Sequence, residues 1–372
     1  VKVSHTATNA TDQNGQAVTI GGSDVALQTI TVGQGSITLA VGASNPVASN
    51  VVAGASNIQV GDFTFSANTA SYNVSKLELK TTAASSSAIN SVSIQYPNQS
   101  GVMQTATAAI NGTTGVALFT NLSFYVPANG SADLSVWVST PTINSGSTIS
   151  GTKIAFTLPH VDGTNNQLQP VGGAVSYDFG GSDLNTNTAG YGFKVLRKSV
   201  PTFAGSSNSV TSAPNTSSTL YQFSVSADPA GAVDFKQFSF NVSTSSGVTL
   251  GGFQLFDAAN PSIALNASGA APIAGVITIT TDNVVQIPAG GSKTFIVKAS
   301  TGTFGSGAQN MSMSLAPADT VLITNTDAST VDSAYHYSWT DRSANSDAVT
   351  GQWTNGYLLR DLSGTYSFTT SS

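Results

Sequence analysis

Short stretches in which apolar and polar residues alternate recur along the whole chain, each bounded by Gly, Asn, Pro or Ser. Because successive residues of a β-strand point to opposite faces, the apolar side chains of each stretch fall on one face. Good examples are residues 76–80, 91–96, 134–138, 238–242 and 294–298. Glu78 is the one glutamate in a chain rich in Thr, Val, Ser, Asn and Gly, so helix formers are scarce. The pattern predicts an all-β protein built from sandwiches.

The chain contains an internal repeat, which emerges when the sequence is aligned with itself at an offset of about 160 residues. Residues 126–138, beginning Val-Pro-Ala-Asn-Gly-Ser, then match residues 287–299, beginning Ile-Pro-Ala-Gly-Gly-Ser. The further matches are Leu77 with Phe238, Ile94 with Leu255, Val116 with Ile277, Leu118 with Ile279 and, at a slightly different offset, Phe65 with Phe223. We therefore predict two tandem antiparallel β-sandwiches of Ig-like or Greek-key type, related by this repeat.

The repeat also predicts the domain boundaries. The first sandwich is expected over residues 26–182 and the second over 190–372, with a linker at 183–189. Residues 1–25 have no counterpart in the second copy and are expected to form an extended arm. The shared Pro-containing element reads as a hairpin, because Pro blocks further strand pairing and the Gly that follows favours a turn.

The arm contains two stretches suited to strands, residues 1–3 and 16–20, separated by polar residues. One interpretation adds a strand to the protein's own first sandwich. The other pairs the arm with the open sheet edge of a neighbouring copy. The residues expected at such an assembly contact are Val1, Val3, Val18 and Ile20.

The charge content is low, with charged residues at 8% of the chain, 12 Lys and Arg, 18 Asp and Glu and a net charge of -6. There is no basic cluster to neutralise phosphates, so nucleic acid is not an expected partner. No apolar stretch is long enough for a membrane-spanning helix, and the chain begins at Val1 as a processed secreted chain would. We expect an extracellular, cell-surface protein whose neutral surface packs against further copies of itself.

Few residues offer catalytic chemistry, since the chain has 3 His and no Cys. His336, Ser338 and Asp341 could be drawn as a hydrolase triad, but neighbouring strand residues point to opposite faces and no nucleophile-elbow motif is present. We expect no catalytic residues, no bound cofactor and no enzymatic activity.

Calcium is the one ion that the sequence suggests, because Asp and Asn loops supply hard oxygen ligands. The weak candidates are Asp178, Asp183 and Asn185 at the domain junction, with Asp162 near Asn165 as a second place. Asx turns explain the same residues without a metal.

The aromatic residues near the C-terminus allow two interpretations. Trp339, Trp353 and Tyr357 either anchor the hydrophobic core or stack against a sugar ring at the surface. Glycans are therefore a possible partner class.

The same region carries a family resemblance. Residues 337–344, Tyr-Ser-Trp-Thr-Asp-Arg-Ser-Ala, and residues 352–362, which include Trp-Thr-Asn-Gly-Tyr-Leu, resemble the ending of large secreted β-sandwich proteins of Patescibacteria. Residues 43–54 and the hairpin at 287–292 are also similar to repeats of those proteins. The resemblance implies a surface-layer-like or filament-forming role. The resulting hypothesis is a structural extracellular protein that self-assembles, and the alternative is an adhesin or carbohydrate-binding module.

Overall fold

The computed structural model describes most of the chain. The described residues are 2–3, 10–18, 25–26, 35–144, 146, 148–165, 174–178, 193–205, 217–246, 248–273, 275–304, 309–322, 335–344, 353–362 and 366–370. Among the residues singled out from the sequence, Val1, Ile20, Asp183 and Asn185 lie outside these ranges.

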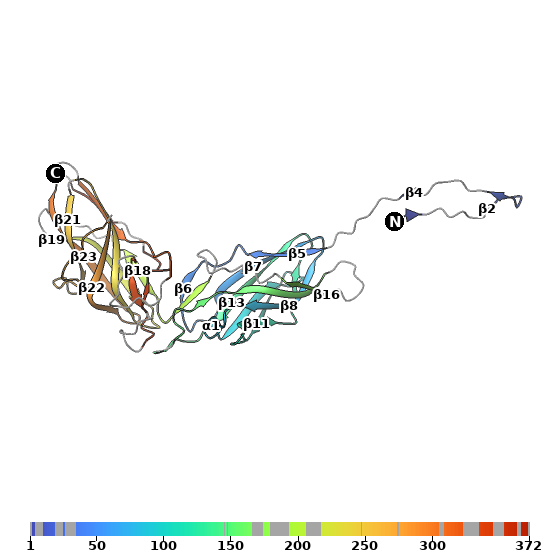
Figure 1. Ribbon diagram of the computed structural model, residues 1–372, viewed down its shortest axis with the longest axis horizontal. Coiled ribbons are helices and arrows are strands. Elements are labelled where there is room, and N and C mark those ends of the chain that lie inside the picture. The colour runs from blue at the N-terminus through green and yellow to red at the C-terminus, as the bar shows by residue number, and fades with distance from the viewer. Residues whose placement is uncertain are drawn as a thin grey trace.

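The first sandwich consists of two packed antiparallel sheets (Figure 1). One sheet has the strand order β10 (Met103–Ala108), β9 (Ser91–Pro97), β13 (Ser131–Ser139), β7 (Ile58–Asn68) and β5 (Ser36–Val41). The other has the order β11 (Val116–Phe119), β8 (Tyr72–Lys80), β15 (Thr157–Asn165) and β16 (Ala174–Asp178), with β12 (Phe124–Val126) also paired to β8. A single helical turn, α1 (Ala83–Ser86), begins after Thr82, whose side chain accepts a hydrogen bond from the Ser85 amide.

The second sandwich is built in the same way. One sheet has the order β18 (Pro201–Gly205), β19 (Ser217–Ala227), β23 (Ser292–Phe304) and β21 (Val248–Asp257). The other has the order β26 (Trp353–Asn355), β25 (Ser338–Thr340), β20 (Val233–Thr244), β24 (Gln309–Leu315) and β27 (Tyr366–Thr370), with β22 (Val276–Ile287) also paired to β20.

Each sandwich has its own hydrophobic core, filled by the inward face of alternating strands. In the first core, Phe65 meets Phe124 edge to face with ring centroids 5.0 Å apart. The second core is more aromatic, and Phe223 contacts both Phe238, at 5.6 Å, and Phe295, at 5.2 Å. The alternation seen in the sequence therefore marks the buried faces of the strands.

The internal repeat is confirmed by the strand order. The order β5, β7, β13, β9 in the first sandwich matches β18, β19, β23, β21 in the second, and the pairing of β15 with β8 matches that of β24 with β20. The Pro-containing hairpins also match, because the Gly130 amide donates to the Pro127 carbonyl oxygen at 3.1 Å and the Gly291 amide to that of Pro288 at 2.8 Å. The predicted fold class, two antiparallel sandwiches related by a repeat, is correct.

The sequence alignment of the repeat is wrong by one residue at β11. Leu118 was matched with a core residue of the second copy, yet it is 47% exposed, whereas Ala117 and Phe119 are buried. In the second sandwich, Ile277 and Ile279 of β22 are buried, and β22 pairs with β20 as β11 pairs with β8. The true counterparts are therefore Ala117 and Phe119, because a shift of one residue turns a strand's side chains to the other face.

A second misalignment lies in β7. Phe63 pairs with Leu134 of β13, as Phe223 pairs with Phe295 of β23. Phe223 therefore corresponds to Phe63 and not to Phe65, two residues away. A shift of two residues keeps the same face buried, so the alternation alone could not detect it.

Residues 194–197 form β17 (Lys194–Arg197), which the sequence analysis assigned to the second domain. In the structure β17 pairs antiparallel with β14 (Lys153–Ile154) and parallel with β6 (Ser49–Val52). This small sheet belongs to the end of the first sandwich, and it lies where the two sandwiches meet.

The arm forms short strands of its own, drawn apart from the sandwiches in Figure 1. Strand β1 (Lys2–Val3) pairs with β4 (Val25–Ala26), and β2 (Ala10–Thr11) pairs with β3 (Ala17–Val18). Within the described residues, no arm strand pairs with a sandwich strand. The described part of the arm therefore adds no strand to its own sandwich, and Val18 is 43% exposed.

Candidate functional site

The junction between the sandwiches is held by hydrogen bonds and apolar contacts between segments that are far apart in the sequence. The C-terminal part of the second sandwich supplies its two motif segments, residues 337–343 and 353–360, and the first sandwich supplies β6, β14, β17 and the loop at 148–152. The Trp-rich C-terminal motif that the sequence analysis singled out therefore lies at this junction.

The motif forms a pair of short strands on the edge of the second sandwich. The Trp339 indole donates to the Asn355 carbonyl oxygen at 3.0 Å, which ties β25 to β26. Asn355 in turn donates to the Val321 carbonyl oxygen at 2.7 Å. A Cβ on Gly356 would lie 2.4 Å from the Tyr337 ring, so only glycine fits where the chain leaves β26. The motif thus fixes the direction of the residues that follow it.

Asp341 is fully buried and links three segments of the junction. One carboxylate oxygen accepts from the Ser150 hydroxyl at 2.5 Å and from the Lys198 amide at 2.7 Å. The other accepts from the hydroxyl and the amide of Ser343, at 2.6 and 3.2 Å. Since Ser150 belongs to the first sandwich and Lys198 to the connection, this one carboxylate holds both sandwiches and the segment between them.

Arg197, at the end of β17, contributes a positive charge to the same junction. Burial lowers the pKa of its guanidinium, and the nearby carboxylate of Asp341 opposes that shift. Its Nη2 donates to the Thr354 hydroxyl at 3.2 Å, and its guanidinium lies 5.3 Å from the centre of the Trp339 ring. The buried guanidinium is therefore stacked on Trp339 and donates one hydrogen bond, while its buried Nε has no hydrogen-bond partner within the described residues.

A small apolar cluster closes the junction. Phe193 and Tyr357 stack with ring centroids 6.4 Å apart and planes inclined by 13°, and Ala48 and Val195 pack beside them. Asn50 of β6 donates from its amide to the carbonyl oxygen of Tyr357 at 3.3 Å. These contacts join β6 and β17 of the first sandwich to the turn that follows β26 in the second.

Lys194 borders this cluster on the side of the first sandwich. Its ammonium donates to the Val47 carbonyl oxygen at 2.8 Å and to the Ser49 hydroxyl at 3.0 Å. Burial first, and then the positive charge of Arg360, lower the pKa of Lys194 to about 8. Arg360 itself donates to the Ala48 carbonyl oxygen at 3.3 Å across the junction.

The predicted aromatic residues are core anchors. Trp339 is completely buried, Trp353 is 1% exposed and Tyr357 6% exposed, so none presents a face on which a sugar could stack. The residues that sequence reasoning missed are Arg197, Asn50 and Phe193. The sequence contained a partial signal for Arg197, because a strand that carries both Lys and Arg is unusual in a chain with 8% charged residues.

The structure does not assemble the triad that could be drawn from the sequence. The His336 ring lies 2.9 Å from the Pro317 carbonyl oxygen and 3.4 Å from Asp319. Asp341 bonds instead to the partners described above. His336 therefore helps to fix the start of the motif.

Of the calcium candidates, Asp178 and Asp162 lie among the described residues, and Asp183 and Asn185 do not. Asp178 lies in β16, directly opposite His160 of β15, and the Asp162 carboxylate is 3.1 Å from the Lys76 ammonium and 2.9 Å from the His160 ring. No cluster of three or more acidic or His side chains suited to a metal occurs among the described residues. Calcium binding at Asp178 stays a prediction.

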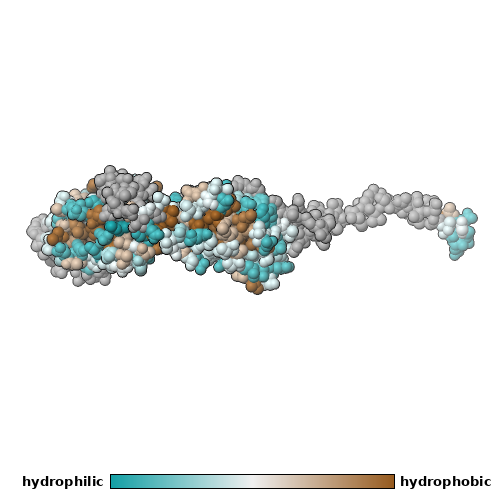
Figure 2. All heavy atoms as spheres, turned by 90° about the horizontal axis from the view of Figure 1, so that it is seen from below, coloured by the Kyte–Doolittle hydropathy of each residue, from teal (hydrophilic) through white to brown (hydrophobic). Residues whose placement is uncertain are grey.

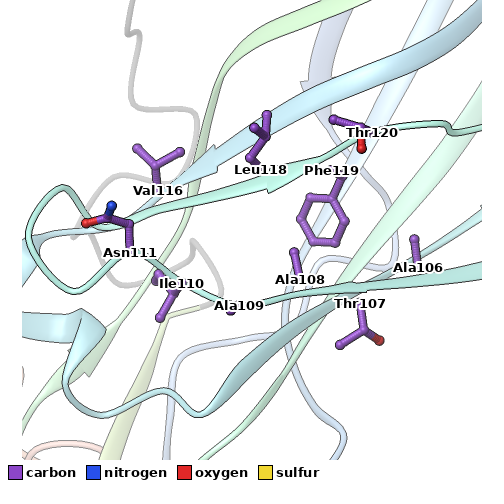
Figure 3. A pocket seen from close by; sticks show the side chains of 10 residues that line it. All are labelled: Ala106, Thr107, Ala108, Ala109, Ile110, Asn111, Val116, Leu118, Phe119 and Thr120. Carbon is purple, nitrogen blue, oxygen red and sulfur yellow. The ribbon is translucent and has the colours of Figure 1, made fainter.

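A groove lined by both apolar and polar residues opens between β10 and β11 at one side of the first sandwich (Figure 3). Its volume is about 480 Å³. Figure 3 shows the Phe119 ring pointing from β11 towards Ala108, while Val116 and Leu118 point away. The residues lining the groove are Ala106, Thr107, Ala108, Ala109, Ile110, Asn111, Val116, Leu118, Phe119 and Thr120, none of them charged.

A second, polar pocket of about 330 Å³ lies on the same sandwich. Asn73 of β8 stands between Tyr125 of β12 and Thr164 of β15, so the three occupy neighbouring strands at one level of the sheet. The remaining lining residues are Asn98, Gln99, Ser100 and Ser123. This pocket offers amides and hydroxyls around one tyrosine.

No protein-family model matches the sequence, and no curated protein matches it. Among solved structures, the BSP domain of a biofilm associated protein is 11% identical over 90% of this chain with a TM-score of 0.21, and the chain spans 59% of its length. The B domain of a biofilm associated protein is 10% identical, with 90% of this chain and 85% of that domain covered and a TM-score of 0.23. BcpA, the major pilin subunit of Bacillus cereus, is 11% identical, with 66% and 65% covered and a TM-score of 0.21. These TM-scores are too low to carry an inference about function.

Among the described residues, no helix has the length and apolar character needed to cross a membrane.

Proposed function

We propose that this chain is a non-enzymatic structural protein of the extracellular cell surface, and that its copies join through sheet edges and the N-terminal arm into a filament or surface layer. The observation that carries the proposal is the buried junction. Neighbouring domains usually move relative to one another unless their interface is large and apolar. Here the apolar cluster is small, and the hydrogen bonds of Asp341, the stacking of Arg197 on Trp339 and the stack of Phe193 on Tyr357 fasten the two sandwiches to each other.

The surface suits close packing of copies. Figure 2 shows apolar residues interspersed with polar ones on the visible face of both sandwiches. Val47, Val102, Met103, Ile263, Ile273 and Val321 are each more than half exposed. With charged residues at only 8% of the chain, contacts between copies would depend on hydrogen bonds and apolar packing, which salt screens little.

Negative-stain electron microscopy of the chain beside a variant lacking residues 1–25 tests this proposal. We expect filaments or sheets from the whole chain and dispersed particles from the deletion variant. If both stay monomeric at high protein concentration, with and without calcium, self-assembly is wrong. If both assemble equally, assembly stands and the arm has no part in it.

The polar pocket supports a second candidate, an adhesin or carbohydrate-binding module. Tyr125 and Asn73 place an aromatic ring beside an amide, the combination that binds sugars by stacking and hydrogen bonding. A glycan array probed with the deletion variant tests it. Binding that is lost in Y125A and kept in Q104A, a change on the nearby strand β10, would support this function, and an array without any signal would reject it.

A further inference from the structure

The exposed edge of β10 in the first sandwich is a place where two copies of the chain can join. We propose that β10 of one copy pairs antiparallel with β10 of a second copy about a two-fold axis at Thr105. The two sheets then form one continuous sheet across the contact. This inference rests on the proposed function and deepens it by identifying the sheet edge and its register. Three observations carry it: the direction of the main-chain groups of β10, its exposed apolar residues and a difference between the two copies of the repeat.

The main chain of β10 points half of its hydrogen-bonding groups away from its own sheet. The strand lies at the end of the sheet and, within the described residues, pairs with β9 alone. The Asn98 amide donates to the Val102 carbonyl oxygen at 3.0 Å, so residues 98 and 102 form a hydrogen-bonded pair. Because bonded and non-bonded pairs alternate along an antiparallel ladder, the even-numbered residues of β10 bond to β9. The amides and carbonyls of Met103, Thr105 and Thr107 therefore point to the outer edge, where an added strand can bond to them.

A two-fold axis at Thr105 is the register that uses these groups symmetrically. Thr105 then lies opposite Thr105 of the second copy, and Met103 lies opposite Thr107, so that each of these pairs exchanges two main-chain hydrogen bonds. Such an axis is perpendicular to the sheet, and it leaves the core-facing sides of both copies on the same side of the joined sheet. A register shifted by one residue would instead place core-facing residues opposite outward-facing ones.

The exposed apolar residues at the start of β10 fit this register. Val102 is 55% exposed and Met103 57% exposed. In the joined sheet, Val102 lies opposite Ala108 of the second copy, which lines the groove (Figure 3). Met103 lies beside the methyl group of Thr107 on the outer face. Each copy thus covers the exposed apolar residues of the other, and this reciprocity favours a second copy as the partner.

The sequence of β10, Met-Gln-Thr-Ala-Thr-Ala, contains no charged residue, Pro or Gly. Natural sheet edges that stay unpaired commonly carry charges, Pro or a bulge, so β10 lacks the features that prevent pairing. Charge would be especially unfavourable here, because residues near a two-fold axis meet copies of themselves or of their neighbours. The other edge strand of this sheet, β5, contains none of the exposed large hydrophobic residues found among the described residues. These features favour β10 over β5 as the contact between copies.

The second sandwich covers the corresponding edge with its own chain. Strand β21 is the counterpart of β9, and residues 264–270 lie along it, with the Leu265 amide donating to the Leu255 carbonyl oxygen at 2.7 Å. The Asn266 side chain accepts from the Leu255 amide at 2.7 Å and donates to the Phe253 carbonyl oxygen at 3.0 Å. A side chain thus takes the place of main-chain groups, and this irregular segment is a poor template for a further strand. The first sandwich instead has a regular strand there, which can be extended.

Disulfide trapping tests the contact and its register, because the chain has no cysteine of its own. In T105C the two cysteines lie opposite each other with Cα atoms about 5.5 Å apart, within the range of a disulfide, so oxidation should give a covalent dimer. The control T107C is equally exposed, but its two cysteines lie four residues or roughly 13 Å apart along the strands and should not link. A mixture of T107C with M103C should give a dimer that contains one chain of each. Equal dimer yields from T105C alone and T107C alone would overturn the inference.

The variant T105P tests the main-chain bonds. The Thr105 amide points away from β9, so proline costs no hydrogen bond within the sheet, and circular dichroism should show an unchanged fold. In sedimentation velocity, T105P should weaken self-association about 30-fold because each copy loses one donor, whereas T105V keeps the amide and should associate like wild type. Filaments that form equally in wild type and T105P, without a T105C dimer, would reject this edge and leave self-assembly standing. A wild-type chain that forms neither dimers nor filaments would reject both, and T105C dimers without filaments would support the edge contact and reject the filament.

Discussion

Replacing Asp341 by asparagine should loosen the junction without altering its size. Each carboxylate oxygen accepts one backbone amide, that of Lys198 on one side and that of Ser343 on the other. Serine hydroxyls can rotate, but backbone amides only donate. Whichever way the new amide group turns, its NH2 faces one backbone N–H, and that buried donor is left without an acceptor.

One buried unsatisfied donor costs about 1–3 kcal/mol. The substitution also removes the negative charge of Asp341, which opposes the lowering of the Arg197 pKa by burial. Two of the three tryptophans, Trp339 and Trp353, lie in this region, so tryptophan fluorescence reports on it. We expect D341N to lower the urea midpoint of the fluorescence transition by an amount equivalent to that free energy.

The control is D133N, because Asp133 is exposed and bonds to Thr64 on the outside of the first sandwich. Surface substitutions of this kind change stability by about 0.5 kcal/mol or less. If D341N and D133N shift the midpoint equally, the carboxylate does not hold the sandwiches together, and the reasoning about the junction is wrong.

Three further predictions follow from the packing. G115A should destabilise the protein by roughly 1–2 kcal/mol because of the positive φ of Gly115. It should cost about 1–3 kcal/mol more because a Cβ there would lie 2.2 Å from a backbone oxygen. In a urea titration, the control G101A should show only the first cost, since a Cβ at Gly101 meets nothing within 4 Å. The stability of wild type relative to K194M should rise from pH 8 towards 10.5, because the pKa of Lys194 is lowered in the folded protein and the unfolded chain binds more protons in that window. A stability difference between the two proteins that does not change with pH would show that the ammonium is not buried. Y357A should lose the stack on Phe193 and destabilise the protein by about 3 kcal/mol. It should also widen the distribution of particle lengths in small-angle X-ray scattering. An unchanged distribution would show that other contacts suffice to hold the sandwiches together.

Some of the candidate site could have been found from the sequence and some could not. The C-terminal motif was recognised as a unit, and its tryptophans were weighed as core anchors, which they are. The partners of the motif were not found, because Ser150 and Arg197 are distant in sequence from Asp341 and no local pattern connects them. The groove was also missed, since it depends on which small residues of β10 face the core.

The sequence by itself determined the all-β class, the duplication and the hairpin at each Pro-Ala element, because alternation and turn chemistry are local properties of the chain. Tertiary structure decided the register of β11, where Phe119 is buried and Leu118 is not, because burial depends on what the facing sheet presents. It also decided that β17 belongs with the first sandwich and that Asp341 closes the junction, since both depend on contacts between residues far apart in the sequence.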